Sequence, residues 1–196
     1  MYMIDMIDTK KDMITALKKS RPSSYFVPGA VIKVNDKMQK YQYTLTEKIN
    51  SNFAEDFEPE LTPKEILELG AFEGKYMNDC INEFPRSWFT KKVLEKLSPE
   101  GPNPDLNYYK IKSRQSLQVW QKKKWIIKPD VRGWFQWYCR YYIGRRLPDV
   151  DARQISRWRS FIRHRAQVVK NCKSNNSCRI KQRQALLQWA YDPRNI

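Results

Sequence analysis

The segment Trp134–Tyr142 places six aromatic side chains in nine consecutive positions, within the run GWFQWYCRYYIGRR. At about 100° per residue, four of these rings fall on one face of a helix (Trp134, Trp137, Tyr138 and Tyr141), and the other two lie together on an adjoining face. A helix that is aromatic over so much of its circumference is typical of a protein core. We therefore expect a central helix here, although one or two of the rings at the surface could instead stack on bases or enter a duplex.

Most of the remaining sequence also favours helices. Thr62-Pro-Lys-Glu65 has the residues of a capping box and predicts a helix over Pro63–Leu69, which ends at Gly70. Apolar spacing, caps and breakers predict further helices at 76–84, 88–97, 113–124, 129–146, from Asp149 or Asp151 to about 170, and 179–191. The fold class expected is mainly α, a compact multi-helix domain.

The first 60 residues are expected to form an N-terminal arm or extension. Two short β-prone segments, 24–27 and 30–34, are separated by loop residues and suggest an edge hairpin. The stretch NFAEDFEPE at 52–60 brings four acids together and suggests a linker or a solvated acidic surface. The expected organisation is thus an arm at 1–60 followed by a helical domain at 61–196.

Charge is distributed very unevenly along the chain. Residues 106–196 hold 22 Lys and Arg against four acids and contain no Glu, a net charge of +18, whereas residues 1–105 have a net charge of −2. Such asymmetry indicates a polyanionic partner, and DNA is the first expectation, with RNA as an alternative. The basic half at 106–196 is therefore the expected nucleic-acid-binding region.

One predicted helix face within this half is basic and lacks acids. If residues 149–170 form one helix, Ile155, Trp158, Phe161, Ile162, Ala166 and Val169 lie on its apolar side. Basic and amide side chains lie opposite, and a merely solvated face would mix Glu with Arg, so contact with phosphates is the favoured interpretation. The expected nucleic-acid-binding residues are Lys122, Lys123, Lys124, Arg145, Arg146, Arg153, Arg157, Arg163, Gln167 and Arg183.

Catalytic candidates are few, because the basic half contains so few acids. Asp149, Asp151 and Asp192 could be helix caps and ion-pair partners, for Arg165 among others, or carboxylates kept ionised in a positive field. His164, the only histidine, is a weaker candidate for a general base. An enzymatic role would be DNA processing or modification, for example base excision with aromatic side chains filling the space of a flipped base. The alternatives are a non-catalytic nucleic-acid-binding or regulatory module and an RNA-associated protein.

Several other classes of site find no support. The sequence has no phosphate-binding glycine loop, HExxH, GxSxG or paired CxxC motif, so we expect no metal and no cofactor. No apolar run long enough to span a membrane occurs, and the N-terminus lacks the pattern of a secretory signal, which predicts an intracellular protein. The four cysteines are then expected to be reduced thiols.

Four stretches resemble a family of uncharacterised proteins from viruses, bacteria and eukaryotes. They are ELTPKEILELGAFEGKYMNDC (60–80), GWFQWYCRYYIGRR (133–146), ARQISRW (152–158) and QRQALLQWAYD (182–192). The resemblance covers the chain from about Glu60 onward and implies no catalytic residue. It implies that the first sixty residues are a variable addition.

Overall fold

The aromatic segment forms α5 (Trp134–Tyr142), and eight of its nine residues are buried. The tightly packed rings include Trp137, Tyr138 and Tyr141, each at most 2% exposed. The prediction of a buried helix is confirmed. Its two polar residues, Gln136 and Arg140, are also fully buried, and both have hydrogen-bond partners.

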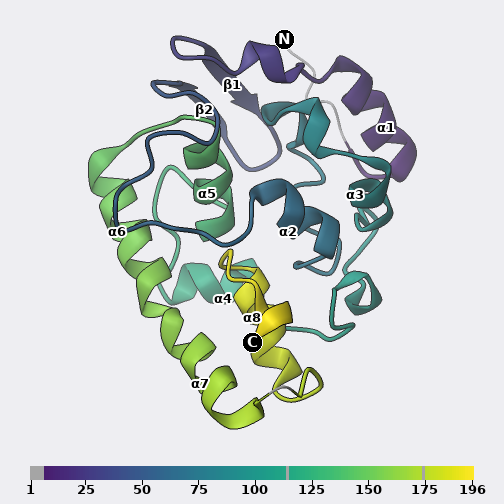
Figure 1. Ribbon diagram of the computed structural model, residues 1–196. Helices are drawn as coiled ribbons and strands as arrows, with labels where there is room; N and C mark the ends of the chain where they lie inside the picture. The colour runs from purple at the N-terminus through teal and green to yellow at the C-terminus, as the bar shows by residue number, and fades with distance from the viewer. Residues whose placement is uncertain (1–6, 114, 174) are drawn as a thin grey trace.

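The computed structural model describes residues 7–113, 115–173 and 175–196 and is mainly helical, as the sequence predicts (Figure 1). In Figure 1 the long α6–α7 pair runs along one side of the molecule, and α1 and α3 lie on the other. The remaining helices are α1 (Lys10–Lys19), α2 (Pro63–Leu69), α3 (Lys91–Glu95), α4 (Leu117–Lys122), α6 (Pro148–Ser160), α7 (Ile162–Cys172) and α8 (Ile180–Leu187). Strands β1 (Val31–Asn35) and β2 (Lys40–Thr44) pair antiparallel, with Val31 opposite Thr44.

Helix α2 has the bounds that its capping sequence predicts. The Thr62 hydroxyl accepts the backbone N–H of Glu65 at 3.2 Å, and the Glu65 carboxylate accepts the backbone N–H of Thr62 at 2.7 Å. These two bonds satisfy donors that the first helical turn leaves without partners. A local signal was sufficient here because both partners lie within one turn of chain.

Other predicted helices are shorter or absent. Residues 76–84 contain only the 3₁₀ turn Ile81–Glu83, since Met77 has a φ of 68°, which no α-helix accommodates. The helix predicted from Pro129 begins instead at Trp134, after Gly133 with a φ of 91°. Helix α1 was not predicted at all, although Thr9 and Asp12 form a capping box at its start.

The single long helix predicted from 149 to 170 is divided at Phe161 into α6 and α7. Because the division changes which side of α7 faces the core, Val168 and Cys172 are buried. Ile162 and Val169, which the helical wheel placed on the apolar side, are 54% and 48% exposed. The apolar face predicted for this region is therefore correct only for its first half.

Residues 7–60 pack into the same hydrophobic core as the helices and do not form a separate arm. Phe57 lies inside the stretch expected to be a linker, yet it is 1% exposed and contacts five aromatic rings of α5 and α6. The Gly144 carbonyl accepts the backbone N–H groups of Thr46 and Glu47, and a Cβ on Gly144 would lie 2.0 Å from the Glu47 oxygen. The first six residues of the predicted arm lie outside the described part of the chain.

Cys172 and Cys178 form a disulfide, which corrects the expectation of reduced thiols at these two positions. The end of α7 and the turn before α8 bring their Cα atoms to 5.4 Å, a normal distance for a disulfide. Spacing in sequence did not indicate this proximity, because it depends on how the chain turns after α7. Cys80 and Cys139 are buried free thiols.

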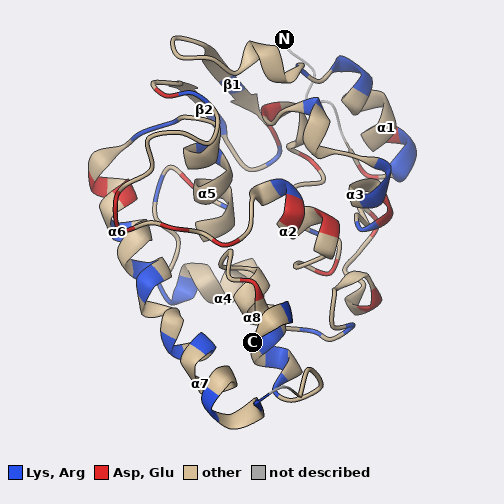
Figure 2. Cartoon of the chain, in the orientation of Figure 1, with Lys and Arg blue, Asp and Glu red and all other residues tan. Residues whose placement is uncertain are grey.

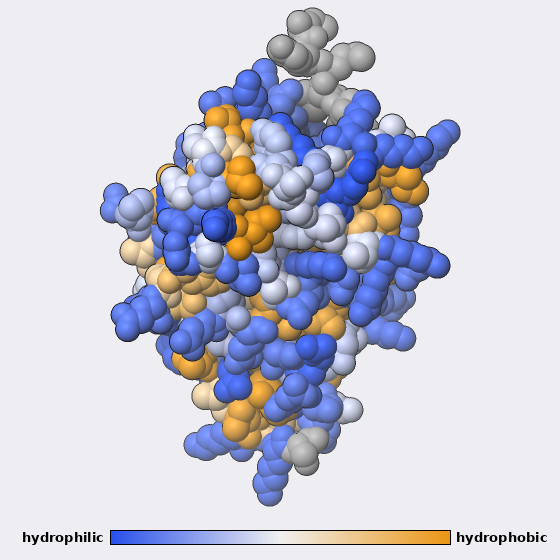
Figure 3. Space-filling model, turned by 45° about the horizontal axis from the view of Figure 1, so that its top comes forward, coloured by the Kyte–Doolittle hydropathy of each residue, from blue (hydrophilic) through white to orange (hydrophobic). Residues whose placement is uncertain are grey.

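The view of the surface in Figure 3 is mostly hydrophilic, with hydrophobic side chains in separate groups. Among the described residues, no helix is both long and apolar enough to cross a membrane.

Candidate nucleic-acid interface

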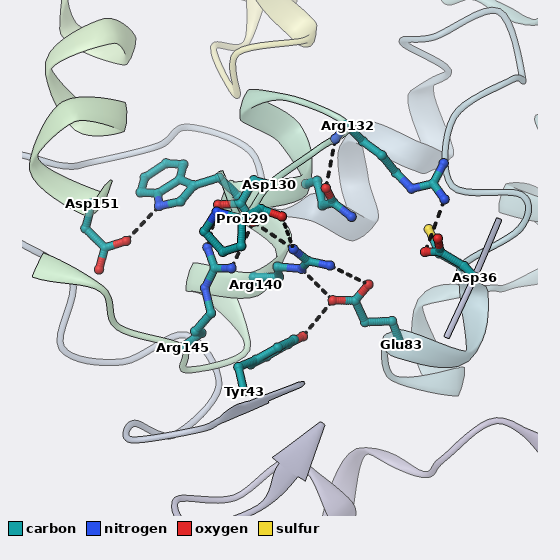
Figure 4. Close-up of polar contacts among 12 residues, drawn as sticks. Asp36, Tyr43, Glu83, Pro129, Asp130, Arg132, Arg140, Arg145 and Asp151 are labelled. Carbon is teal, nitrogen blue, oxygen red and sulfur yellow. Dashed lines mark hydrogen bonds and ion pairs between the residues drawn. The ribbon is translucent and has the colours of Figure 1, made fainter. Parts of the chain in front are cut away.

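A network of charged side chains lies in the core between α5 and the hairpin (Figure 4). The Arg140 guanidinium donates to both carboxylate oxygens of Glu83, at 2.6 and 3.1 Å, and to Asp130 at 3.0 Å. Arg145 donates twice to Asp130, at 2.9 and 2.8 Å, and the Tyr43 hydroxyl donates to Glu83 at 2.8 Å. Two guanidiniums thus neutralise two carboxylates away from water, which is what buried charges require.

This network corrects the prediction that Arg145 binds nucleic acid. The side chain is 1% exposed, and Asp130 occupies its guanidinium. Arg183 is likewise fully buried, and its guanidinium donates to the carbonyl oxygens of Cys178, Pro193 and Asn175. Neither cation reaches the surface, because the tertiary structure supplies each with internal acceptors.

A second buried cluster next to the network contains candidate metal ligands. One ligand atom from each of Asp36, Cys80 and Glu83 lies within 4.8 Å of the others. Arg132 already pairs with Asp36 at 3.1 Å, Arg140 occupies Glu83, and burial raises the pKa of the Cys80 thiol. Two guanidiniums and a protonated thiol are a poor environment for a cation, so these residues do not fit a metal site.

Two of the predicted catalytic carboxylates have structural partners. Asp151 is 6% exposed and accepts the Trp137 indole N–H and the Leu147 backbone N–H, both at 2.7 Å, while burial raises its pKa. Asp192 accepts two bonds from the Arg194 side chain, at 2.8 and 2.6 Å, and this hydrogen bonding lowers its pKa. The partners of Asp151 and Asp192 therefore favour the interpretation of these residues as helix caps and ion-pair partners.

The other two catalytic candidates lie at separate places on the surface. Asp149 is exposed at the start of α6 and lines a shallow hollow of about 310 Å³ together with Lys124, Lys128 and Arg153. His164 stacks on Phe161 with ring centroids 4.3 Å apart, and burial together with Arg163 lowers its pKa. The four candidates therefore do not form one constellation.

The prediction that Arg165 pairs with a nearby Asp is wrong. Its partner is Glu60, at 3.4 Å, from the acidic stretch that packs along α6 and α7. The same stretch supplies Asp56 to Arg159 at 2.7 Å. Acids of the N-terminal half thus neutralise cations on one side of the basic helices.

A cleft of about 640 Å³ opens on the other side of these helices, between α4 and the bodies of α5, α7 and α8. We call it the aromatic cleft. Its aromatic lining includes Trp120, Trp125, Trp134, Phe135, Phe161 and Trp189. Its basic lining consists of Arg132, Arg157, Arg163 and His164. No Asp or Glu among the described residues lines it.

Arg157 belongs to the basic lining of the cleft and also contacts its aromatic lining. Its guanidinium donates to the Trp125 carbonyl at 2.9 Å and to Gln154 at 3.0 Å, and it lies over the Trp189 ring with a centroid distance of 5.4 Å. Desolvation by burial, followed by repulsion from Arg153, lowers its pKa. A guanidinium against an aromatic face at the wall of an open cleft is well placed to meet an anion.

A basic hollow of about 500 Å³ adjoins the aromatic cleft, with Trp125 and Arg157 in the lining of both. Its lining adds Lys124 and Arg153. Figure 2 shows α6 and α7 with Lys and Arg and few acids, whereas Asp and Glu gather near α2 and the preceding loop. The charge asymmetry of the sequence is therefore also an asymmetry in space.

The structure thus brings together part of the predicted binding set. Lys124, Arg153, Arg157 and Arg163 line the aromatic cleft or the basic hollow, and Lys122 and Lys123 are exposed on the adjoining end of α4. Two further members have other contacts: the Arg146 guanidinium binds the carbonyls of Tyr141 and Ser51, and the Gln167 amide accepts from Gln182 at 2.6 Å.

The sequence analysis offered rings of 134–142 as possible base contacts, and Trp134 and Phe135 line the aromatic cleft, but it did not single out Trp120, Trp125 or Trp189. Trp120 and Trp125 flank the run Lys122–Lys124, and that alternation of aromatic and basic residues was the available signal. Trp189 lines the cleft and also packs on Trp134 and Phe161, with ring centroids 5.0 and 4.8 Å apart. Only folding showed that these distant rings share one cavity.

Comparison of the chain with protein-family models, with curated proteins and with solved structures gives no match. The family resemblance of the four stretches above stays an expectation. The function is therefore inferred from the geometry of the site itself.

Proposed function

We propose that this protein binds nucleic acid, with the aromatic cleft and the basic hollow as its binding surface. The observation that carries the proposal is the combination of aromatic rings and cations, with no carboxylate in the lining, in two adjoining hollows of the described chain that share Trp125 and Arg157. Cations attract phosphates, and aromatic faces accept bases. A site for a cationic or sugar ligand would instead be expected to contain carboxylates.

The binding form of the proposal is favoured over the base-excision form. Base excision needs a positioned acid or base next to the extruded base. Asp151 and Asp192 are engaged elsewhere, and Asp149 lines a different hollow. His164 alone among the four candidates lines the aromatic cleft, which supports a binding role more than a catalytic one.

Fluorescence anisotropy with labelled duplex DNA, single-stranded DNA and structured RNA over a salt series tests the proposal. Since binding releases counterions, log K should fall linearly with log salt, with a slope of roughly −0.7 to −0.9 for each phosphate contacted. An affinity that does not change with salt, or no binding to any of the three, would contradict the proposal.

Two triple variants locate the surface. Lys124→Gln/Arg153→Gln/Arg163→Gln removes three cations of the proposed surface and should weaken binding and reduce the salt slope by about two to three units. The control Lys10→Gln/Lys11→Gln/Arg159→Gln removes the same charge from exposed positions on α1 and from the Asp56-facing side of α6. If both variants weaken binding equally, net charge rather than this surface is responsible.

A further inference from the structure

Four rings form a row along the aromatic cleft. From α5 to α7 they are Trp134, Trp189, Phe161 and His164, and their centroids are separated by 5.0, 4.8 and 4.3 Å. The planes of neighbouring rings differ by 31°, 14° and 34°, so the row is close to a continuous stack. All four rings line the cleft, and because stacked rings cover one another's faces, the row presents mainly ring edges along one of its walls.

The segment 115–128, which contains α4, supplies Trp120 and Trp125 to the same cleft. None of its side chains is buried. The Trp120 ring lies against Gly133, where a Cβ would be 3.4 Å from it, and the Trp125 carbonyl accepts one bond from Arg157. A segment with so few buried contacts moves at little cost in packing, so a planar group can be accommodated between it and the ring row.

These features distinguish between forms of nucleic acid. In an intact duplex each base face is covered by its neighbours, so a duplex offers phosphates and groove edges to a protein. Aromatic side chains that line a concave cavity are reached only by a base that has left its stack. The volume of about 640 Å³ lies within the usual range of roughly 300–1,000 Å³ for small-molecule sites.

Phosphate contacts are available next to the rings. Arg157 and Arg163 line the cleft itself, and Lys124 and Arg153 line the hollow that adjoins it. A nucleotide with its base in the cleft would therefore have cations near its own phosphate and near those of its neighbours. This arrangement matches the common construction of single-strand sites, an aromatic platform beside a basic track.

We propose that the aromatic cleft holds an unpaired nucleotide, with the base between the ring row and the Trp120–Trp125 segment, so that the preferred partner is a single strand or a duplex with an extruded base. This inference rests on the proposed function and names the form of its substrate. The cations position the phosphates, and the rings select for an unstacked base.

The inference can be tested with oligonucleotides of equal length that carry one central 2-aminopurine. Three forms are compared: a single strand, a duplex in which the 2-aminopurine is a bulge, and a perfect duplex. Each form is made with a DNA and with an RNA backbone. We expect the single strand and the bulge to bind about five- to 100-fold more tightly than the perfect duplex at the same salt, the effect of one stacked base. The fluorescence of their 2-aminopurine should fall on binding. Equal affinity for the perfect duplex without any fluorescence change would overturn the inference and leave the proposed function standing, whereas no binding to any probe would overturn both.

Trp125 offers the variant least disturbing to the fold, because the side chain is 42% exposed. Trp125→Ala should lose about fivefold or more of the single-strand affinity but little of the duplex affinity, and Trp125→Phe should restore most of it. Tyr108→Ala removes an aromatic side chain of similar exposure, 43%, from outside the cleft and serves as the matched control. A similar loss in the Tyr108 and Trp125 variants, or no loss in either, would contradict the assignment.

Discussion

Arg140 and Glu83 form a two-bond ion pair in the core, although 57 residues separate them. The Nε–Oε1 and Nη2–Oε2 distances are 2.6 and 3.1 Å, and neither side chain is more than 2% exposed. Tyr43 of β2 also donates to Glu83. The pair thus links the central helix to the hairpin and to the turn at Ile81–Glu83.

Glu83→Gln should reduce the free energy of unfolding by about 3–5 kcal/mol, because it leaves the Arg140 charge partly uncompensated in the interior. Urea denaturation followed by circular dichroism measures the loss. The control Asp56→Asn breaks the exposed pair with Arg159 and should change stability by at most about 1 kcal/mol. If both variants lost the same free energy of unfolding, burial would not determine how much an ion pair contributes to stability.

Asp151→Asn should destabilise the fold by about 1–3 kcal/mol and leave nucleic-acid affinity unchanged. An amide has one acceptor oxygen, whereas the Asp151 carboxylate accepts from both Trp137 and Leu147, so one donor would lose its partner. Denaturation and anisotropy on the same preparation separate the two effects. Loss of an activity or of binding with unchanged stability would favour the catalytic interpretation instead.

Binding should strengthen on acidification through His164. Its pKa lies below the usual value because burial and Arg163 disfavour the charged form, so its positive charge appears only below about pH 6.5. Between about pH 7.5 and pH 5.5, affinity for single strands should rise more for the wild type than for His164→Gln. Identical pH profiles of the two proteins would exclude a contribution from His164.

The lowered pKa of His164 has the opposite effect on the stability of the fold, which decreases on acidification. Because the unfolded chain binds the His164 proton at a higher pH than the folded chain, this group lowers stability as pH falls below the unfolded value of about 6.5. Circular dichroism at each pH therefore has to accompany the binding measurement. A fall in affinity together with a loss of helical signal would report unfolding, not titration in the cleft.

Reduction of the Cys172–Cys178 disulfide should lower stability by about 2 kcal/mol, the chain-entropy value for a loop this short. Thermal unfolding with and without a dithiol reductant measures the difference. Cys172→Ser/Cys178→Ser should unfold at the same temperature with and without reductant. If the wild type also shows no response to reductant, hydrogen bonds such as those from Arg183 to Cys178 and Asn175 hold the loop without the disulfide.

Local sequence predicted those features whose causes are local. The capping box at Thr62 and Glu65 fixed the start of α2, and the density of rings in 134–142 indicated the buried helix. The division at Phe161 could not be predicted this way, because the helical wheel assumed one continuous helix through that residue. Phe57 was hidden by the acids around it, since an apolar residue in an acidic stretch gives no periodic signal.

By itself the sequence determined the mainly helical class, the aromatic core and the excess of positive charge in the second half. Only the tertiary structure decided which cations are exposed: Arg140, Arg145 and Arg183 are buried, whereas Arg153 and Arg163 are exposed. The physical reason is that a guanidinium is buried wherever distant chain segments supply enough acceptors to replace water. Its own residue type and spacing say nothing about those acceptors.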